Sequence, residues 1–166
     1  ELPLTVLQEQ VTWYEVDAAA RFTAEHHPVW IWMDDPSWYG FPAMDGAVKA
    51  AQDCGGSPVD PDTRTFDPDP ANEAALTGFL RDHLAGVGGV RSSKTCLYTL
   101  TPDRDFVLDR LPEAPEVLVA LGAAHGFKFA AWFGRTLADL ALGGEPGPEL
   151  APFRYERESL HRPIDR

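Results

Sequence analysis

Residues 94–103 read KTCLYTLTPD, a β-branched and aromatic segment that ends in turn residues. This composition predicts a short strand. Because side chains alternate along a strand, we expect Lys94, Cys96 and Tyr98 on one face of it. In an arbitrary strand, a small thiol beside a half-buried tyrosine would be an ordinary part of the core. The rest of the chain decides whether this face has a chemical role.

The composition is that of an acidic globular chain. Of its 166 residues 44% are hydrophobic, and 14 basic against 26 acidic side chains give a formal charge of −12. The length suits one ordinary domain. The charge disfavours nucleic acid and anionic membrane surfaces, so a small molecule or a protein is the expected partner.

The two cysteines, Cys54 and Cys96, lie too far apart in the sequence to suggest a disulfide framework, and no Cys/His cluster has metal-ligand spacing. No apolar run approaches the length of a membrane span, and no basic and apolar leader opens the chain. We therefore expect a reducing, cytoplasmic location and no metal.

The first half of the chain predicts strands. Residues 2–16 have β-propensity, and the apolar segments 29–33 and 38–41 flank an Asp-Asp-Pro-Ser turn, which predicts a hairpin. Residues 47–51 follow as a further strand that carries Lys49, although an isolated strand lysine usually points to solvent. The aromatic residues of the hairpin suit either a sheet core or the wall of an apolar ligand pocket.

The second half predicts two helices and shorter strands. After a Gly/Pro/Asp-rich loop, Asp69 is a plausible N-cap of a helix that continues toward Gly86. Segments 106–109, 116–120 and 153–155 have strand character. Residues 127–142 predict a helix that is apolar most of the way round and hence buried among partners. Its first turn, beside His125 and Lys128, suits an anionic ligand group, and a plain helix start with an ordinary histidine is the alternative.

Three segments together resemble one family of enzymes. The segment TCLYT (95–99) followed by PDRDFVLD (102–109), the segment HGFKF (125–129), and YGFP (39–42) with Lys49 are similar to the C-terminal half of the monomeric sarcosine oxidase and N-methyltryptophan oxidase family. These are FAD-dependent amine oxidases. The resemblance covers essentially the whole chain in the right order.

The resemblance implies an α+β fold. It would comprise a mixed, largely antiparallel sheet of a substrate domain with a covering helix, and a strand–helix segment that packs into an FAD domain. Residues 1–100 would be the C-terminal part of the substrate (catalytic) domain, and residues 101–166 would return to the FAD-binding domain.

The resemblance also implies roles for particular residues. Cys96 matches the cysteine bonded through sulfur to the 8α position of FAD, and nearby cations such as Lys94 are expected to favour its thiolate. Lys49 matches the catalytic lysine that helps reduced flavin react with oxygen. The remaining matches have cofactor-binding or substrate-binding roles: His125, Gly126 and Lys128 for the cofactor, and Tyr39, Tyr98, His125 and Lys128 for the substrate.

The implied reaction oxidises N-methyl or other secondary amino acids, such as sarcosine, to imines while oxygen is reduced to hydrogen peroxide. A relative acting on cyclic or glycated amines is one alternative, because the lining near Tyr39 and Gln52 is unusual. A non-catalytic remnant that serves as an assembly module is another. Retention of Cys96, Lys49 and Lys128 together disfavours the remnant.

The chain also departs from the family. No G-x-G-x-x-G fingerprint occurs in it, so the N-terminal dinucleotide-binding half is expected on another chain or on a removed segment. The chain opens without Met, which suggests a fragment or a processed chain, and alone it is expected to be inactive. Residues 50–53 (AAQD) stand where the family often has a histidine, and Ala123-Ala124 replaces a typical Phe-Ser-Gly approach to His125.

Overall fold

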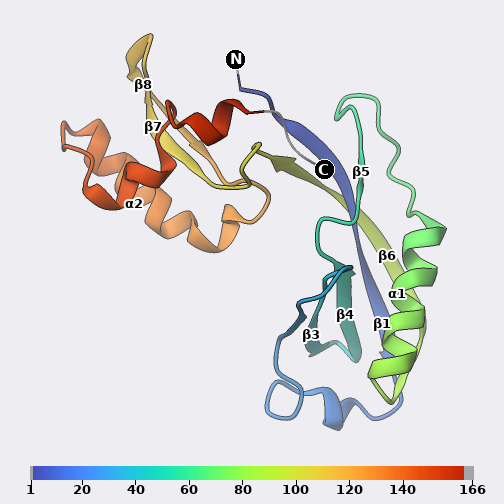
Figure 1. Ribbon diagram of the computed structural model, residues 1–166. Helices are drawn as coiled ribbons and strands as arrows, with labels where there is room; N and C mark the ends of the chain where they lie inside the picture. Colours follow the sequence, from blue (N-terminus) through green and yellow to red (C-terminus); the bar gives the residue numbers. More distant parts are fainter. Residues whose placement is uncertain (1, 163–166) are drawn as a thin grey trace. The chain divides into compact units, whose positions relative to one another are not determined.

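The computed structural model describes residues 2–162 and contains two compact units. One consists of residues 7–97 and is here called the sheet unit, and the other consists of residues 1–6 and 98–166 and is here called the hairpin unit. The fold is α+β with largely antiparallel strands and few helices, as predicted (Figure 1).

The main sheet has six strands in the order β2-β3-β4-β1-β5, with β6 also paired to β1. The pairs β1–β4, β1–β5, β2–β3 and β3–β4 are antiparallel. Two of the strands, β1 and β6, extend by a few residues into the hairpin unit. The strand bounds are β1 Thr5–Val16, β2 Trp30–Trp32, β3 Trp38–Met44, β4 Ala47–Gln52, β5 Ser57–Pro58 and β6 Val87–Leu100.

Strand register separates the side chains of the sheet unit into two faces. Lys49 of β4 is paired with Trp13 of β1 and with Phe41 of β3, so these three side chains lie in one row on one face. Their neighbours one residue along, such as Val48 and Tyr14, point to the opposite face. We call the first the Lys49 face and the second the helix face.

Helix α1 (Pro70–His83) covers the helix face (Figure 1). It begins as predicted, because the Asp69 side chain accepts a hydrogen bond from the N–H of Ala71 at 2.8 Å. Leu76 and Leu80 are its buried residues. They pack in one core with Phe22 of the short 3-10 helix η1 (Ala19–Phe22) and with four residues of the sheet. The sheet residues are Tyr14, Trp38, Val48 and Ala50.

The hairpin unit is built on the antiparallel pair β7 (Val107–Leu111) and β8 (Ala114–Leu121). Helix α2 (Ala130–Ala141) packs against this hairpin in a core formed by Leu108, Leu140 and Leu150. Three 3-10 helices complete the unit: η2 Gly126–Phe129, η3 Pro148–Phe153 and η4 Glu158–His161.

The predicted strand at residues 153–155 is wrong. Pro152 and Phe153 end η3, and the backbone N–H of Tyr155 is bonded at 2.8 Å to the Asp109 side chain instead of to a strand. The Asp109 carboxylate thus takes the place of the backbone carbonyl that a neighbouring strand would have offered to this N–H.

The strand that holds Cys96 is longer than predicted. It begins at Val87 and includes Gly88 and Gly89, which lie outside the strand predicted at residues 94–103. A Cβ at Gly88 would lie 3.3 Å from the carbonyl oxygen of Glu15, so the backbone of β6 passes close to β1 and a side chain here would be tightly packed.

Candidate functional site

Lys49 is held between two aromatic rings on the Lys49 face. Its Nζ lies 5.1 Å from the centroid of the Phe41 ring and 5.7 Å from that of Trp13. An ammonium group at this range is attracted by the negative face of an aromatic ring. The side chain is half-buried, so it is more confined than a strand lysine that points freely into water.

A second ammonium group shares the Trp13 ring. The Nζ of Lys94 lies 5.9 Å from the ring centroid, which places Lys94 on the Lys49 face as well. The chain has only three lysines, Lys49, Lys94 and Lys128. Two of the three therefore meet at one indole.

Cys96 follows Lys94 by two residues on β6 and lies on the same face. It is a free, half-buried thiol. Burial raises the pKa of this thiol, the charge of Glu9 raises it further, and Lys49 and Arg64 lower it. The net effect is a raised pKa, so the expected thiolate is not favoured here, and Lys94 is not among the cations that act on the sulfur.

Glu9 is a site residue that the sequence analysis missed. Its side chain is 3% exposed, and one carboxylate oxygen accepts a hydrogen bond of 3.0 Å from the N–H of Gly56. The sequence signal that could have indicated it is the polar run Gln8-Glu9-Gln10 within a predicted strand. In the structure, Glu9 and Gln10 of this run are buried.

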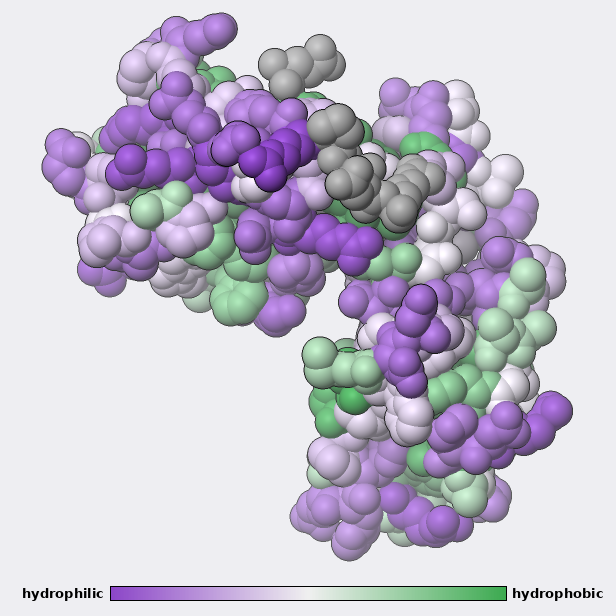
Figure 2. Space-filling view, in the orientation of Figure 1, coloured by the Kyte–Doolittle hydropathy of each residue, from purple (hydrophilic) through white to green (hydrophobic). Residues whose placement is uncertain are grey.

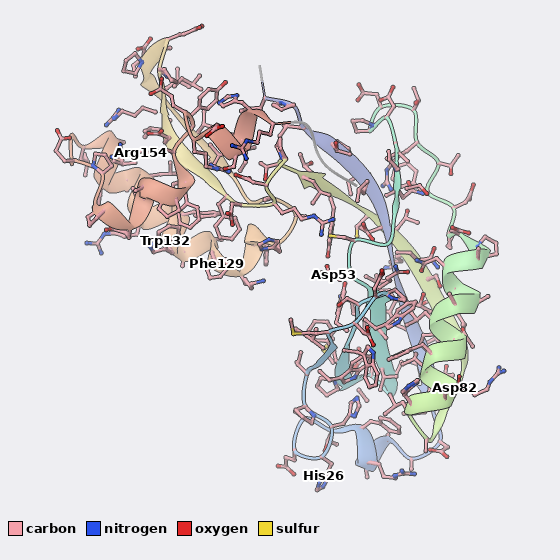
Figure 3. All side chains as sticks on the ribbon, in the orientation of Figure 1. His26, Asp53, Asp82, Phe129, Trp132 and Arg154 are labelled. Atoms are coloured by element: carbon pink, nitrogen blue, oxygen red, sulfur yellow. The ribbon has the colours of Figure 1, made fainter. Side chains whose placement is uncertain are left out.

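Tyr39 and the end of β4 border the same region of the sheet. Tyr39 alternates with Phe41 along β3, so both lie on the Lys49 face, and their rings are 6.0 Å apart in an edge-to-face arrangement. Asp53, labelled in Figure 3, ends the segment 50–53 that stands where the family often has a histidine, and its N–H is bonded at 3.0 Å to the carbonyl oxygen of Ser37. Tyr98 is the last of the predicted site residues on β6. It is half-buried and is the first residue of the segment 98–166 of the hairpin unit.

His125, Gly126 and Lys128 lie together in the hairpin unit: His125 is the N-cap of η2, and Gly126 and Lys128 belong to η2. Gly126 is buried, and a Cβ there would lie 3.0 Å from the Phe133 ring. The side chains of His125 and Lys128 are exposed. The His125 ring packs 5.2 Å from Phe106, and the Nζ of Lys128 lies 5.5 Å from the Phe129 ring.

The helix start at these residues differs from the prediction. The turn before η2 contains two non-glycine residues with left-handed backbone, Ala123 at φ 42° and Ala124 at φ 74°. The chain then makes a 3-10 turn, and α2 begins only at Ala130. Lys128 therefore precedes the α-helix, and the α-helical N-terminus expected beside His125 is not formed.

The helix predicted at residues 127–142 was expected to be apolar most of the way round and buried among partners, and within the described part of this chain it is partly uncovered. Several large apolar side chains at its start and end are exposed, with Phe129 and Trp132 close together in Figure 3 and an apolar area over the same part of Figure 2. The exposed fractions are 94% for Phe127, 40% for Phe129, 36% for Trp132 and 88% for Leu142.

Two kinds of site are not found in the part of the chain that the structure describes. Within residues 2–162 no three His, Cys, Asp or Glu side chains are grouped so as to hold a metal ion. Over the same residues, no helix has the length and apolar character needed to cross a membrane.

The chain belongs to the FAD dependent oxidoreductase (DAO) family, whose pattern it matches over residues 1–140. It is 34% identical over 168 residues to the monomeric sarcosine oxidase of Bacillus sp. (strain NS-129), an alignment that covers 98% of this chain and 43% of that protein. It is 33% identical over 165 residues to the N-methyl-L-tryptophan oxidase of Salmonella heidelberg (strain SL476), covering 96% of this chain and 44% of the relative. The chain thus spans less than half the length of these relatives.

Solved structures of flavin oxidases share the fold. The structure of NikD, an unusual amino acid oxidase essential for nikkomycin biosynthesis, superposes with a TM-score of 0.71 at 27% sequence identity, covering 93% of this chain and 42% of NikD. Amadoriase II, a fructosamine oxidase from Aspergillus fumigatus, reaches a TM-score of 0.70 at 17% identity, covering 96% of this chain and 44% of that chain. The second similarity concerns the fold alone.

Proposed function

We propose that this chain is the substrate- and flavin-attachment half of an FAD-dependent oxidase that acts on N-methyl or other secondary amino acids. The observation that carries the proposal is the grouping of Cys96 and Lys49 on the sheet face that α1 leaves uncovered. Membership in an FAD-dependent family supplies the cofactor for which such a face is suited.

Cys96 would hold the flavin covalently through its sulfur. A half-buried thiol on an uncovered strand face is accessible to a ring system laid against that face. Bound there, FAD would supply the two-electron acceptor for amine oxidation.

Lys49 would assist the reaction of the reduced cofactor with oxygen. The two aromatic rings at 5.1 and 5.7 Å hold the ammonium group in place. A fixed cation stabilises the negative charge that develops on oxygen, without reorganising when it develops. The products would be the imine of the substrate and hydrogen peroxide.

The other residues would have binding roles. Tyr39 and Tyr98 would line the substrate site, Lys128 would pair with the substrate carboxylate, and His125 would be the pocket residue beside Lys128. His125, Gly126 and Lys128 would also border the cofactor. Residues 1–100 would belong to the substrate domain and residues 101–166 to the FAD domain, with the dinucleotide-binding half supplied by another segment or chain.

The two cysteines provide a matched test of the attachment site. In the full-length protein, intact mass under denaturing conditions is expected to show one added FAD, which Cys96→Ser removes and Cys54→Ser retains. Covalent flavin that persists in Cys96→Ser would contradict the assignment.

Peroxide release identifies the substrate class. Sarcosine, N-methyltryptophan, a cyclic secondary amino acid and a glycated amine should be compared in one assay, and we expect the N-methyl amino acids to give the highest kcat/KM. Lys49→Met is expected to slow reoxidation by oxygen far more than reduction by the amine. A flavin-loaded protein that is inactive on all four would support the assembly-module alternative.

A further inference from the structure

Glu9 is unusual in its burial. Among the residues that the structure describes, it is the only acidic or basic side chain in the buried class, at 3% exposed. Removing a carboxylate from water costs several kcal/mol unless its surroundings compensate. One of its oxygens is bonded to the N–H of Gly56. A fold that needed only packing here would be served better by an apolar side chain.

Cross-strand contacts place Glu9 beside Cys96. Strands β1 and β6 are paired, and their side-chain contacts run in opposite directions: Glu15 to Arg91 at 2.6 Å, then Thr12 to Ser93 at 2.9 Å. Further along, one nitrogen of Arg64 donates to both Gln8 at 2.9 Å and Thr95 at 3.2 Å.

Side-chain alternation then fixes the face. Thr12 is bonded to Ser93, and Ser93 is bonded to Glu73 of α1, so these two residues lie on the helix face, and alternation places Gln8 and Thr95 there as well. Glu9 and Cys96 each follow one of these residues by a single position. They therefore lie at neighbouring positions on the Lys49 face, where Glu9 acts electrostatically on the sulfur.

We propose that Glu9 accepts the proton of Cys96 when the sulfur forms its bond to the flavin. This inference rests on the proposed attachment at Cys96. The S–H proton passes to the Glu9 carboxylate, and the sulfur bonds to the 8α methyl carbon, which loses one hydrogen as a proton. The two electrons released pass through the ring system to oxygen, which leaves with two protons as hydrogen peroxide.

The charged groups that act on the sulfur determine whether loss of the Glu9 charge should speed or slow flavin attachment. The charge of Glu9 disfavours the thiolate, whereas Lys49 of β4 and Arg64 of the loop after β5 favour it. Lys94 and Glu15 are further charged groups on the same face, and Glu15 is ion-paired with Arg91. If Glu9 were only a bystander charge, its neutralisation would favour the thiolate and speed attachment. As the proton acceptor, its removal slows attachment.

The experiment uses the full-length protein, prepared without flavin and mixed with FAD in air. The fraction of protein with covalent flavin is followed by intact mass over time, between pH 6 and pH 9, in the wild type, Glu9→Gln, Glu9→Asp and the control Glu15→Gln. Glu15 lies on the same strand and face, but its partner is Arg91. Retention of noncovalent FAD by Cys96→Ser/Glu9→Gln, relative to Cys96→Ser, reports on folding.

We expect Glu9→Gln to slow attachment roughly 100-fold at pH 7, within the range of general-base effects. Its rate should rise with pH, Glu9→Asp should recover part of the rate, and Glu15→Gln should match the wild type. Attachment in Glu9→Gln that is unchanged or faster overturns the role of Glu9 and leaves Cys96 as the attachment site. Absence of an adduct at Cys96 in the wild type overturns the proposed attachment itself. If Glu9→Gln does not retain FAD, the Glu9→Asp variant decides. Its carboxylate is withdrawn by one methylene, so an attachment rate and pH profile equal to those of the wild type would contradict direct proton transfer.

Discussion

Asp103 shows how one carboxylate anchors the end of the chain in the hairpin unit. It accepts hydrogen bonds from Nε and Nη2 of Arg157 at 2.6 and 2.9 Å and from the hydroxyl of Ser159 at 2.6 Å. The two charged side chains are only 13% and 11% exposed. The Arg157 guanidinium, as the largest cause, holds the pKa of Asp103 well below its usual range.

We expect Asp103→Asn to lower the free energy of unfolding by about 2–3 kcal/mol at pH 7, because Arg157 would be left without its carboxylate in a mostly buried position. The lowered pKa means that the wild-type contribution is present above the ordinary carboxyl pKa of about 4 and is lost as the pH falls below it. Urea unfolding at pH 7 and pH 3 should therefore show a difference between the two proteins that shrinks in acid. Asp105→Asn is the control, since Asp105 joins this network through its backbone carbonyl; an equal loss in that variant would contradict the assignment.

Ala124 is strained by its backbone at φ 74°, a region that L-residues rarely adopt. Glycine adopts it freely, so Ala124→Gly is expected to stabilise the protein by about 1 kcal/mol. Ala138→Gly, in the interior of α2, should destabilise by a similar amount. Thermal unfolding of the two variants side by side checks the opposite signs, and a lower Tm for Ala124→Gly would refute the strain.

The strand face of the predicted site residues can be anticipated from the sequence, but their environment cannot. The face shared by Lys94 and Cys96 follows from alternation alone, because a strand period of two is insensitive to tertiary packing. The expectation that Lys94 favours the Cys96 thiolate did not hold. The pKa of the thiol depends instead on where β1 and β4 place Glu9 and Lys49. Glu9 was missed for the same reason: its burial is set by Gly56, 47 positions away.

At the level of elements, two glycines of the sheet unit illustrate opposite constraints. A Cβ at Gly40 of β3 would lie 2.4 to 2.6 Å from indole atoms of Trp30, its partner on β2. A Cβ at Gly78 of α1 would meet nothing within 4 Å.

We expect Gly40→Ala to destabilise by about 1–3 kcal/mol through overpacking, and Gly78→Ala to stabilise by about 1 kcal/mol through helix propensity. Urea unfolding of both variants measures the two effects. The further variant Gly40→Ala/Trp30→Ala should show positive coupling, because the indole that clashes is then absent. Simple additivity would contradict the contact.

Elements with local signals were predicted well, and those shaped by distant contacts were not. The helix at Pro70 was recognisable from the cap at Asp69 and the spacing of its apolar residues. The long β6 was underestimated, since Gly88 and Gly89 are typical loop residues until the close passage of Glu15 is known. The segment at Tyr155 carried strand propensity, which the hydrogen bond to Asp109 overrides.

At the scale of the molecule, apolar side chains remain uncovered in both units. Phe127, Met33 and Leu142 are 94%, 88% and 88% exposed. Such surfaces favour association. We expect the isolated chain to self-associate in light scattering, and Phe127→Ser/Leu142→Gln to reduce association without lowering the Tm. Glu116→Gln, an exposed polar change, is the control; a monodisperse wild-type monomer would contradict this prediction.

The rarity of lysine gives the chain a built-in set of chemical landmarks. Cleavage after the three lysines divides it into peptides 1–49, 50–94, 95–128 and 129–166. Cys54 falls in the second peptide and Cys96 in the third, while the other two contain no cysteine. A lysine-specific protease therefore separates the two thiols, and the yellow colour of a covalently retained flavin in one peptide identifies the attachment residue. Because Lys49 and Lys94 share one indole, protection of both ammonium groups from reductive methylation when flavin binds would map the cofactor onto the sheet without a crystal.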